Sequence, residues 1–385
     1  MAKTGRTGGR AKRVLQTVHL WLGLLLAIPI IMIGLSGSAL LLQREILDYS
    51  VPAATSDGQH APLETLIAAA AKAAPHNATA RSIVPPAYEG APTTISFDTN
   101  GRPPRTRVHV DPVSGEVLGT EPVTNRGPVL DFLIRAHAFL LLPAPIGFPM
   151  VGWMAGIMTF MAVSGIVLWW PRKGMWRQAL WMRKGARGLR FHLEFHHVVG
   201  FWGSAILFVM GLSGLYLVYP DTFRQTTEMV LPADRSPRDR DRQYTPGPAP
   251  LHSDGAVAAA LAAVPNTRAV NVQLPPTPDL PFVVHLETNE LRPKLPPILV
   301  TLNARTGEIN FIDDPRRYSI SDKFLNLQHT LHFGIGLGWA WKVLVFISGI
   351  LPLALGITGL MIYVKRRAVK RPRSEAAVAV TQPAE

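Results

Sequence analysis

The chain has 385 residues, a formal net charge of +13 at pH 7 and no cysteine. Without cysteine there is no disulfide, zinc–thiolate site, iron–sulfur cluster, covalent c-type haem or thiolate nucleophile, so any transition metal must rest on histidine, methionine or carboxylate. Hydrophobic residues make up 48% of the chain, an ordinary share for a globular protein, but they are concentrated in four blocks. This distribution predicts an α-helical integral membrane protein.

Each of the four apolar blocks is about 20 residues or longer, which is enough to cross a hydrocarbon core of roughly 30 Å. The first block is too long for the apolar region of a signal peptide, and no A-x-A-like cleavage site follows it. We therefore assign the transmembrane segments to residues 14–47, 150–171, 191–220 and 326–364, the last of which opens with an interfacial stretch.

The basic residues predict how these segments are oriented. The short stretches 1–13, 171–190 and 365–373 hold 18 of the 39 basic residues and no acidic residue, whereas the long stretches between them have balanced charge. By the positive-inside rule, the N-terminus (1–13), the loop 172–190 and the tail 365–385 face the cytoplasm of a bacterial inner membrane. Because the basic stretches flank membrane segments, we expect no nucleic acid as a partner and membrane lipid instead.

The chain reads as two copies of one unit, because several residues recur at a single offset of 177 without a gap. The matched residues are Arg13, His19, Gly23 and Gly34-Leu35-Ser36-Gly37 in the first copy, and Arg190, His196, Gly200 and Gly211-Leu212-Ser213-Gly214 in the second.

The two long segments predict two small α+β domains on the periplasmic side, at residues 48–135 and 221–325. Each begins with an alanine-rich helical stretch and ends in an antiparallel hairpin, at Val108–Val117 and Val300–Ile309, around an Asp/Asn-x-x-Ser/Thr-Gly turn. We expect an interfacial helix at 136–149, and a loop in the Pro- and Arg-rich stretch 231–250.

Seven of the twelve histidines cluster near the ends of the predicted transmembrane segments: His19, His137, His192, His196, His197, His329 and His332. His19 and His196 lie at matching places near the cytoplasmic face, and His137 and the pair His329/His332 precede membrane segments on the opposite face. Ionisable groups at membrane depth are costly and usually functional. The sequence therefore predicts two layers of histidine ligands, one near each face.

Two facing imidazoles are the axial ligands that low-spin haem b requires, whereas a closed zinc site needs four ligands at one point. We predict one haem b between His19 and His196, with His197 as an alternate, and a second that His137 shares with the opposite repeat. If the two repeats are aligned on the hairpin glycines Gly115 and Gly307, His329 corresponds to His137. If they are aligned on Gly165 and Gly359, the position that corresponds to His137 lies nearer His332. Small residues let a flat cofactor or a neighbouring helix approach closely, and the candidates are Gly34, Gly37, Gly211 and Gly214.

The sequence resembles the PepSY-associated transmembrane family over nearly its whole length, and it looks closest to the FoxB-type ferric-siderophore reductases. The hairpins ending in Ser114-Gly115-Glu116 and Thr306-Gly307-Glu308 resemble the PepSY module. In the family pattern the recurrent histidine is that of Leu-His-Phe-Gly, which favours His332 over His329. The remaining motifs are His19-Leu-Trp-Leu-Gly23, Ala136-His137-Ala-Phe-Leu-Leu, Ser164-Gly165-Ile-Val-Leu-Trp169-Trp170, Phe195-His196-His197-Val-Val-Gly200, Leu331-His332-Phe-Gly334 and Ile357-Thr-Gly359.

The resemblance implies a di-haem b reductase that passes electrons from the cytoplasmic side to a ferric siderophore or other ferric chelate in the periplasm and releases Fe(II). We find no hydrolytic triad and no G-x-G-x-x-G motif, so we expect no catalytic residue beyond the haem ligands and a quinol or separate cytoplasmic reductase as donor. Two alternatives stay open. One is a cytochrome-b-type carrier for another periplasmic acceptor, and the other is a non-enzymatic PepSY binding or regulatory protein.

Overall fold

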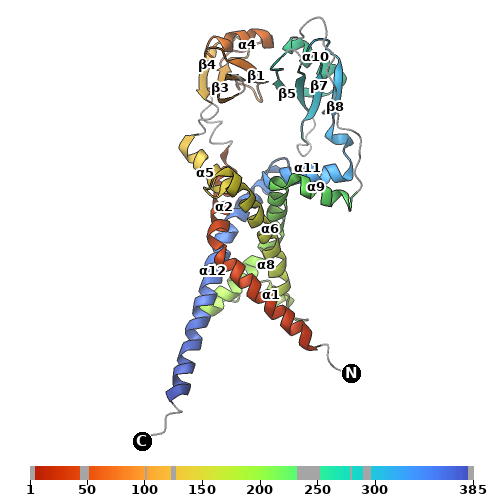
Figure 1. Ribbon diagram of the computed structural model, residues 1–385. Coiled ribbons are helices and arrows are strands. Elements are labelled where there is room, and N and C mark those ends of the chain that lie inside the picture. Colours follow the sequence, from red (N-terminus) through yellow and green to blue (C-terminus); the bar gives the residue numbers. More distant parts are fainter. Residues whose placement is uncertain are drawn as a thin grey trace. The chain divides into compact units, whose positions relative to one another are not determined.

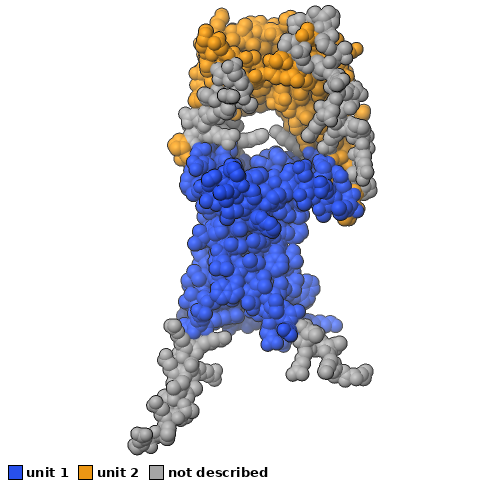
Figure 2. Space-filling model, viewed as in Figure 1, with its two compact units in different colours: residues 1–43, 130–229, 324–385 blue, residues 44–129, 230–323 orange. Residues whose placement is uncertain are grey.

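The computed structural model describes residues 5–43, 52–99, 102–122, 127–231, 252–277, 280–288 and 296–379. The first four residues, residues 44–47 of the first predicted membrane segment, the predicted loop after Leu231 and the end of the tail lie outside the described residues. The chain divides into two compact units. Unit 1 comprises residues 1–43, 130–229 and 324–385, and unit 2 comprises residues 44–129 and 230–323 (Figure 2).

Unit 1 is helical (Figure 1). Three of its helices are long and apolar enough to cross a membrane, and the bent pair α1 and α2 adds a fourth span if the two are counted together. The chain is therefore a multi-pass membrane protein. The helices that lie wholly or mostly in this unit are α1 (Gly5–Leu25), α2 (Ala27–Leu40), α5 (Gly127–Phe139), α6 (Ala144–Trp169), α7 (Trp176–Ala179), α8 (Gly188–Val218), α9 (Pro220–Glu228), α11 (Ile320–His332) and α12 (Gly338–Ala379).

The first apolar block, predicted as one segment, is bent by 63° between α1 and α2. The physical reason is Pro29 in the first turn of α2, which the sequence interpretation did not weigh. Proline has no N–H, so it cannot donate to the carbonyl of Leu25 four residues earlier, and its ring disfavours a straight helix at that point. The apolar segment continues, but its two parts point in different directions.

The interfacial helix expected at 136–149 is placed differently. The structure has a helix at 127–139 instead, and α6 already begins at Ala144. Between them Leu140 and Leu141 adopt φ values of 53° and 60°, which is the left-handed region that leucine rarely enters. The corresponding connection from α11 to α12 uses glycines at positive φ, Gly334, Gly336 and Gly338. Nothing in the apolar pattern of the first connection indicated that the helix would stop there.

Helix packing in unit 1 depends on small residues. α6 lies along α8, and α12 packs on both α2 and α8. A Cβ atom on Gly34 would lie 2.5 Å from the carbonyl oxygen of Gly349 in α12, and one on Gly211 would overlap the Thr159 hydroxyl in α6. Any larger residue would push these helices apart, as is usual where transmembrane helices meet at glycine.

Unit 2 is an antiparallel sheet of eight strands in the order β4-β3-β2-β1-β5-β6-β7-β8. The two domains expected at 48–135 and 221–325 thus share one sheet, because β1 and β5 pair directly, with Ser82 opposite Gln273 and Ile83 opposite Val272. The elements are α4 (Leu63–Ala71), β1 (Thr79–Val84), β2 (Thr93–Thr99), β3 (Arg102–Val110), β4 (Val117–Pro122), α10 (Ser253–Ala263), β5 (Thr267–Gln273), β6 (Phe282–Thr288), β7 (Ile298–Leu302) and β8 (Ile309–Asp313).

The core of unit 2 lies between one face of this sheet and the helices α4 and α10, and it is formed by alternate strand residues such as Phe97 and Leu286. The two helices also cap each other. The Asp254 carboxylate accepts from the backbone N–H groups of Leu63 and Glu64 at 2.9 and 3.3 Å, and the Glu64 carboxylate accepts from the N–H of Ser253 at 2.7 Å. Carboxylates are favoured at helix N-termini, so these bonds join the two halves of the unit.

Both predicted hairpins are present, as β3–β4 and β7–β8. Asp111 accepts at Oδ1 from the N–H groups of Val113 and Ser114, both at 3.0 Å, and Asn303 makes the equivalent bonds in the second hairpin. Asp111 also accepts at Oδ2 from Thr55 and Ser56 at 3.1 Å. Burial alone would raise the pKa of Asp111, but these four N–H groups favour the carboxylate and hold its pKa well below the usual range.

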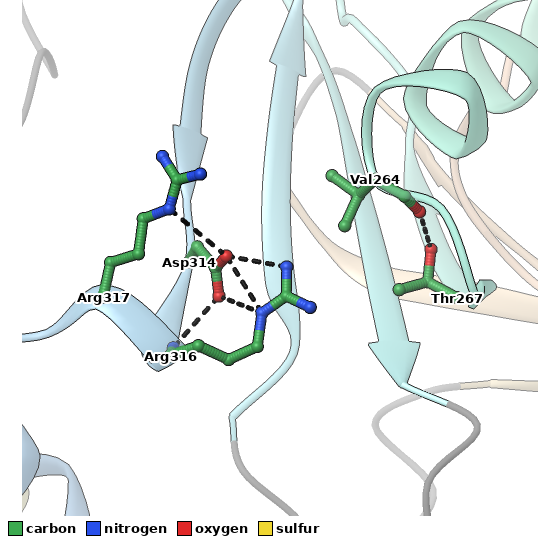
Figure 3. Close-up of polar contacts among 5 residues, drawn as sticks. All are labelled: Val264, Thr267, Asp314, Arg316 and Arg317. Carbon is green, nitrogen blue, oxygen red and sulfur yellow. Dashed lines mark hydrogen bonds and ion pairs between the residues drawn. The ribbon is translucent and has the colours of Figure 1, made fainter.

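An ion pair lies directly after the end of β8. Asp314 caps the short 3₁₀ helix η1 (Pro315–Arg317), and its carboxylate lies 2.8 Å from Arg316 Nη2 and 3.9 Å from Arg317 Nε (Figure 3). The same figure shows the Thr267 hydroxyl donating to the Val264 carbonyl at 2.6 Å, where α10 gives way to β5. Both contacts fix the ends of elements in unit 2.

Candidate functional site

His19 and His196 form the first histidine pair of unit 1. Nδ1 of His19, on α1, lies 2.7 Å from the Ser164 hydroxyl of α6, and Nδ1 of His196, on α8, lies 3.0 Å from the Thr358 hydroxyl of α12. α1 packs on α6 and α12, and α8 packs on the same two helices. Four different helices thus meet at this pair, two supplying an imidazole and two supplying its hydrogen-bond partner.

His137 and His332 form the second pair. Their ring centres are 6.1 Å apart, and the ring planes are inclined by 55°. Nδ1 of His137, on α5, lies 2.8 Å from the backbone carbonyl oxygen of Ile33 in α2, and Nδ1 of His332, on α11, lies 3.1 Å from the Ser213 hydroxyl of α8. The arrangement repeats that of the first pair, except that a backbone carbonyl takes the place of one hydroxyl.

Each of the four imidazole rings packs against a glycine of a neighbouring helix. A Cβ atom at that glycine would lie 2.7 Å from Cε1 of His137 at Gly37, and 3.3, 3.5 and 3.6 Å from the corresponding ring atom at Gly214, Gly165 and Gly359. Every one of these glycines follows a serine or threonine, so each apolar segment carries one Ser/Thr-Gly pair that receives a histidine. The pairs are Ser36-Gly37, Ser164-Gly165, Ser213-Gly214 and Thr358-Gly359.

The hydrogen bonds indicate which ring nitrogen carries the proton. The Ile33 carbonyl can only accept, so Nδ1 of His137 is the donor. The hydroxyls of Ser164, Ser213 and Thr358 each lie within donating distance of a carbonyl three or four residues earlier in their own helix, so they use their proton there and accept from the histidine. The Nε2 lone pair of each ring is then left for another partner, as in metal-bound histidines whose other nitrogen donates to the protein.

Not all of the residues expected at the site lie there. His329 is exposed and its ring stacks on Phe333 with centres 4.3 Å apart, so of the two candidates it is His332 that lies beside His137. His197 is also exposed and lies near Arg366. Among the small residues proposed for the pocket, Gly37 and Gly214 contact histidine rings, whereas Gly34 and Gly211 serve helix packing.

Sequence reasoning did not identify the hydroxyls that bond to the rings. Ser164 and Thr358 were noted only in the motifs of the family resemblance. Ser213, like Ser36, was noted in the repeat as a small residue beside a possible cofactor, but not as a hydrogen-bond partner of a histidine. The signal that was available is that every apolar segment contains a Ser/Thr-Gly pair, the fourth segment containing a second one at Ser348-Gly349. Hydrogen-bonding residues placed behind a metal-binding histidine are a common requirement for fixing its tautomer and orientation, so this recurrence was a usable clue.

The chemistry available to each pair follows from its donors. No group of three or more His, Asp or Glu side chains able to hold a metal ion occurs within the described part of the chain. Two imidazoles on opposite sides of one metal, each with its nitrogen about 2 Å from that metal, have ring centres roughly 6 Å apart. At 6.1 Å between their ring centres, His137 and His332 could each give one nitrogen to a metal whose other ligands come from a macrocycle.

Comparison with known proteins identifies the family. The model of the PepSY-associated TM region matches residues 16–366, so the chain belongs to this family. The match includes the four paired histidines and the four Ser/Thr-Gly pairs that contact them. No curated protein matches the chain.

Proposed function

We propose that this PepSY-associated membrane protein is a di-haem b reductase that carries electrons across a bacterial inner membrane to a ferric chelate. His19 and His196 would hold the inner haem, and His137 and His332 the outer one. Bound haem b would supply reversible one-electron transfer between its ferric and ferrous forms. The substrate class that we favour is a periplasmic ferric siderophore, from which reduction releases Fe(II).

The observation that carries the proposal is the geometry of the second pair. Two half-buried imidazoles have their ring centres 6.1 Å apart, and each has its Nδ1 engaged by a neighbouring helix. With Nδ1 engaged as the donor, the Nε2 lone pair of each ring is left to bind another group. Ionisable side chains at membrane depth are usually functional, so the arrangement supports a ligand held by both rings.

The distance between the two pairs supports an electron path. Gly214, on which His332 rests, follows His196 by 18 residues in the unbroken helix α8, which is about 27 Å at a rise of roughly 1.5 Å per residue. That is close to the thickness of a hydrocarbon core of roughly 30 Å. Two cofactors placed in this way would lie one near each face of the membrane, so electrons could enter at one and leave at the other, which a single site could not provide.

The direction of transfer rests on the basic segments. We place both termini and the loop 172–190 in the cytoplasm, and with them the pair His19/His196. A quinol or a separate cytoplasmic reductase would then deliver electrons at this side. Unit 2 and the pair His137/His332 would face the periplasm, where the acceptor is reduced. A reporter fused after Gly185 should behave as cytoplasmic and one fused within 231–250 as periplasmic, and the reverse result would exchange the donor and acceptor sides.

The haem content tests the proposal directly. Purified protein should give a reduced-minus-oxidised spectrum of a low-spin b-type cytochrome, and the pyridine haemochrome should approach two haems per chain. A ratio near one haem per chain would show that only one of the histidine pairs binds haem. A ratio near zero would favour the alternative of a non-enzymatic PepSY protein. Dithionite-reduced protein should then be reoxidised by ferric siderophores. Reoxidation by other periplasmic acceptors alone would indicate a different cytochrome-b-type carrier.

A further inference from the structure

The four histidines share one arrangement, in which a Ser/Thr-Gly pair of a neighbouring helix contacts the imidazole ring. Each Ser/Thr-Gly pair combines a glycine, whose missing Cβ lets the imidazole approach the helix, with a residue before it whose hydroxyl bonds to its own helix. In three pairs that hydroxyl also meets the Nδ1 of a histidine, at 2.7 Å for Ser164, 3.0 Å for Thr358 and 3.1 Å for Ser213. These three hydroxyls are buried.

At the fourth histidine a backbone carbonyl takes the place of the hydroxyl. Nδ1 of His137 donates to the carbonyl of Ile33, which lies four residues before Gly37 in α2. At the other three histidines the acceptor is a side-chain hydroxyl, so a substitution can remove it without changing the backbone.

We propose that Ser164, Thr358 and Ser213 are positioning residues that set the reduction potential of the proposed haems by accepting a hydrogen bond from Nδ1 of the axial histidines. The inference rests on the proposed function, because it concerns how the ligands are tuned. An acceptor at Nδ1 increases the basicity of the imidazole, and a more basic ligand stabilises the ferric state relative to the ferrous state. Removing the acceptor should therefore raise the potential.

The arrangement also predicts which haem responds. Ser164 and Thr358 serve only the first pair, and Ser213 serves only the second. Thr358→Val keeps the shape of the side chain but removes the hydroxyl, and Thr358→Ser keeps the hydroxyl. Ser348 on α12 is the matched control, because it is buried and donates to the carbonyl of Val345 at 2.6 Å as the other hydroxyls do, but no histidine bond to it occurs within the described residues.

The experiment is a redox titration of the purified full-length protein, followed at the haem absorption bands, with low-spin electron paramagnetic resonance spectra of each variant. We expect Thr358→Val and Ser164→Ala to raise the potential of one haem by up to a tenfold change in its equilibrium constant, which is about 59 mV for one electron. Ser213→Ala should shift the other haem. Thr358→Ser and Ser348→Ala should match the wild type. Loss of one haem in Thr358→Val that Thr358→Ser restores would also support the inference.

Three results would overturn it. Unchanged potentials and spectra in all three hydroxyl-removing variants would show that the hydroxyls do not act on the ligands. An equal effect of Thr358→Ser and Thr358→Val, or an equal effect of Ser348→Ala, would assign the change to packing. Wild-type protein without haem is a different failure, because it removes the proposed function itself.

Discussion

The helix that carries His19 stops at Leu25 and resumes in a new direction at Ala27, whereas the helix that carries His196 runs unbroken from Gly188 to Val218. The two segments match at an offset of 177, but Pro29 of the first corresponds to Ile206 of the second. Despite the bend, His19 and Gly37 remain 18 residues apart, as are His196 and Gly214. What the two halves share is therefore the chemistry of the histidine sites, and what differs is the backbone that presents it.

The same contrast holds at the other histidines and at the hairpins. His137 rests on Gly37 far more closely than His332 rests on Gly214, and its acceptor is a backbone carbonyl instead of a hydroxyl. The first hairpin turn is built on a carboxylate and the second on an amide. At this second pair the histidine of the first half is thus held by a backbone carbonyl and a close glycine contact, and the histidine of the second half by a hydroxyl with more room. Substitutions of equal size should therefore have unequal effects in the two halves.

The largest expected effects come from the ligands themselves. His137→Ala should remove the outer haem and abolish reduction of a bulky ferric chelate, while the inner haem still accepts electrons from the donor side. His19→Ala should leave the outer haem bound but stop turnover with the physiological donor. Separate pyridine haemochromes and spectra of the two variants measure this.

Replacement of His332 and of His329 provides the matched control for that experiment. Only His332→Ala should cost a haem, because His329 is exposed and stacked on Phe333. Two haems retained in His137→Ala, or a silent His332→Ala beside a damaging His329→Ala, would contradict the pairing.

A smaller but more selective effect is expected from alanine at the glycines. In Gly37→Ala the new Cβ would lie 2.7 Å from Cε1 of His137, so the ring must move and haem occupancy at that pair should fall several-fold. In Gly165→Ala the Cβ would lie at 3.5 Å from His19, an ordinary contact, and occupancy should stay unchanged. Alanine is favoured over glycine in a helix interior by roughly 1 kcal/mol, so neither change should impair folding through helix propensity. Equal haem occupancy in the two variants would show that His137 does not fit more tightly against Gly37 than His19 fits against Gly165.

The smallest effect concerns the hairpins of unit 2. Asp111→Asn keeps the two turn bonds that Asn303 makes in the other hairpin but loses acceptance from Thr55 and Ser56, so we expect a local cost of about 1–3 kcal/mol at pH 7. Hydrogen–deuterium exchange on the full-length protein should show weaker protection of the β3–β4 peptides, with the β7–β8 peptides as an internal control.

The pH dependence of that protection has a definite sign. The folded-state pKa of Asp111 is held below that of an unfolded aspartate, which is about 4, so its contribution is fully present above that value and is lost as pH falls toward the folded pKa. Between pH 5 and pH 3, after correction for intrinsic exchange rates, the wild-type β3–β4 peptides should lose protection more steeply than the same peptides of Asp111→Asn. The same slope in Asp111→Asn would show that another group is responsible.

The sequence by itself determined the membrane character, the hairpins and the histidines worth testing. Apolar blocks of about 20 residues are local features, and so is an Asp/Asn-x-x-Ser/Thr-Gly turn, because one stretch of chain contains all the atoms that define it. The offset of 177 paired His19 with His196 for the same reason, since a repeat can be read without knowing which residues touch.

Only the tertiary structure decided how these parts meet. The joining of eight strands through β1 and β5 depends on pairing between segments about 190 residues apart, and no local pattern encodes that register. Counting along the chain gave two partners for His137, and only the family resemblance favoured His332 over His329; the structure shows that His332 is the one whose ring lies beside His137. The hydroxyls of Ser164 and Thr358 became part of the site because α1 packs on α6 and α8 on α12, which brings a buried N–H to an acceptor on another helix.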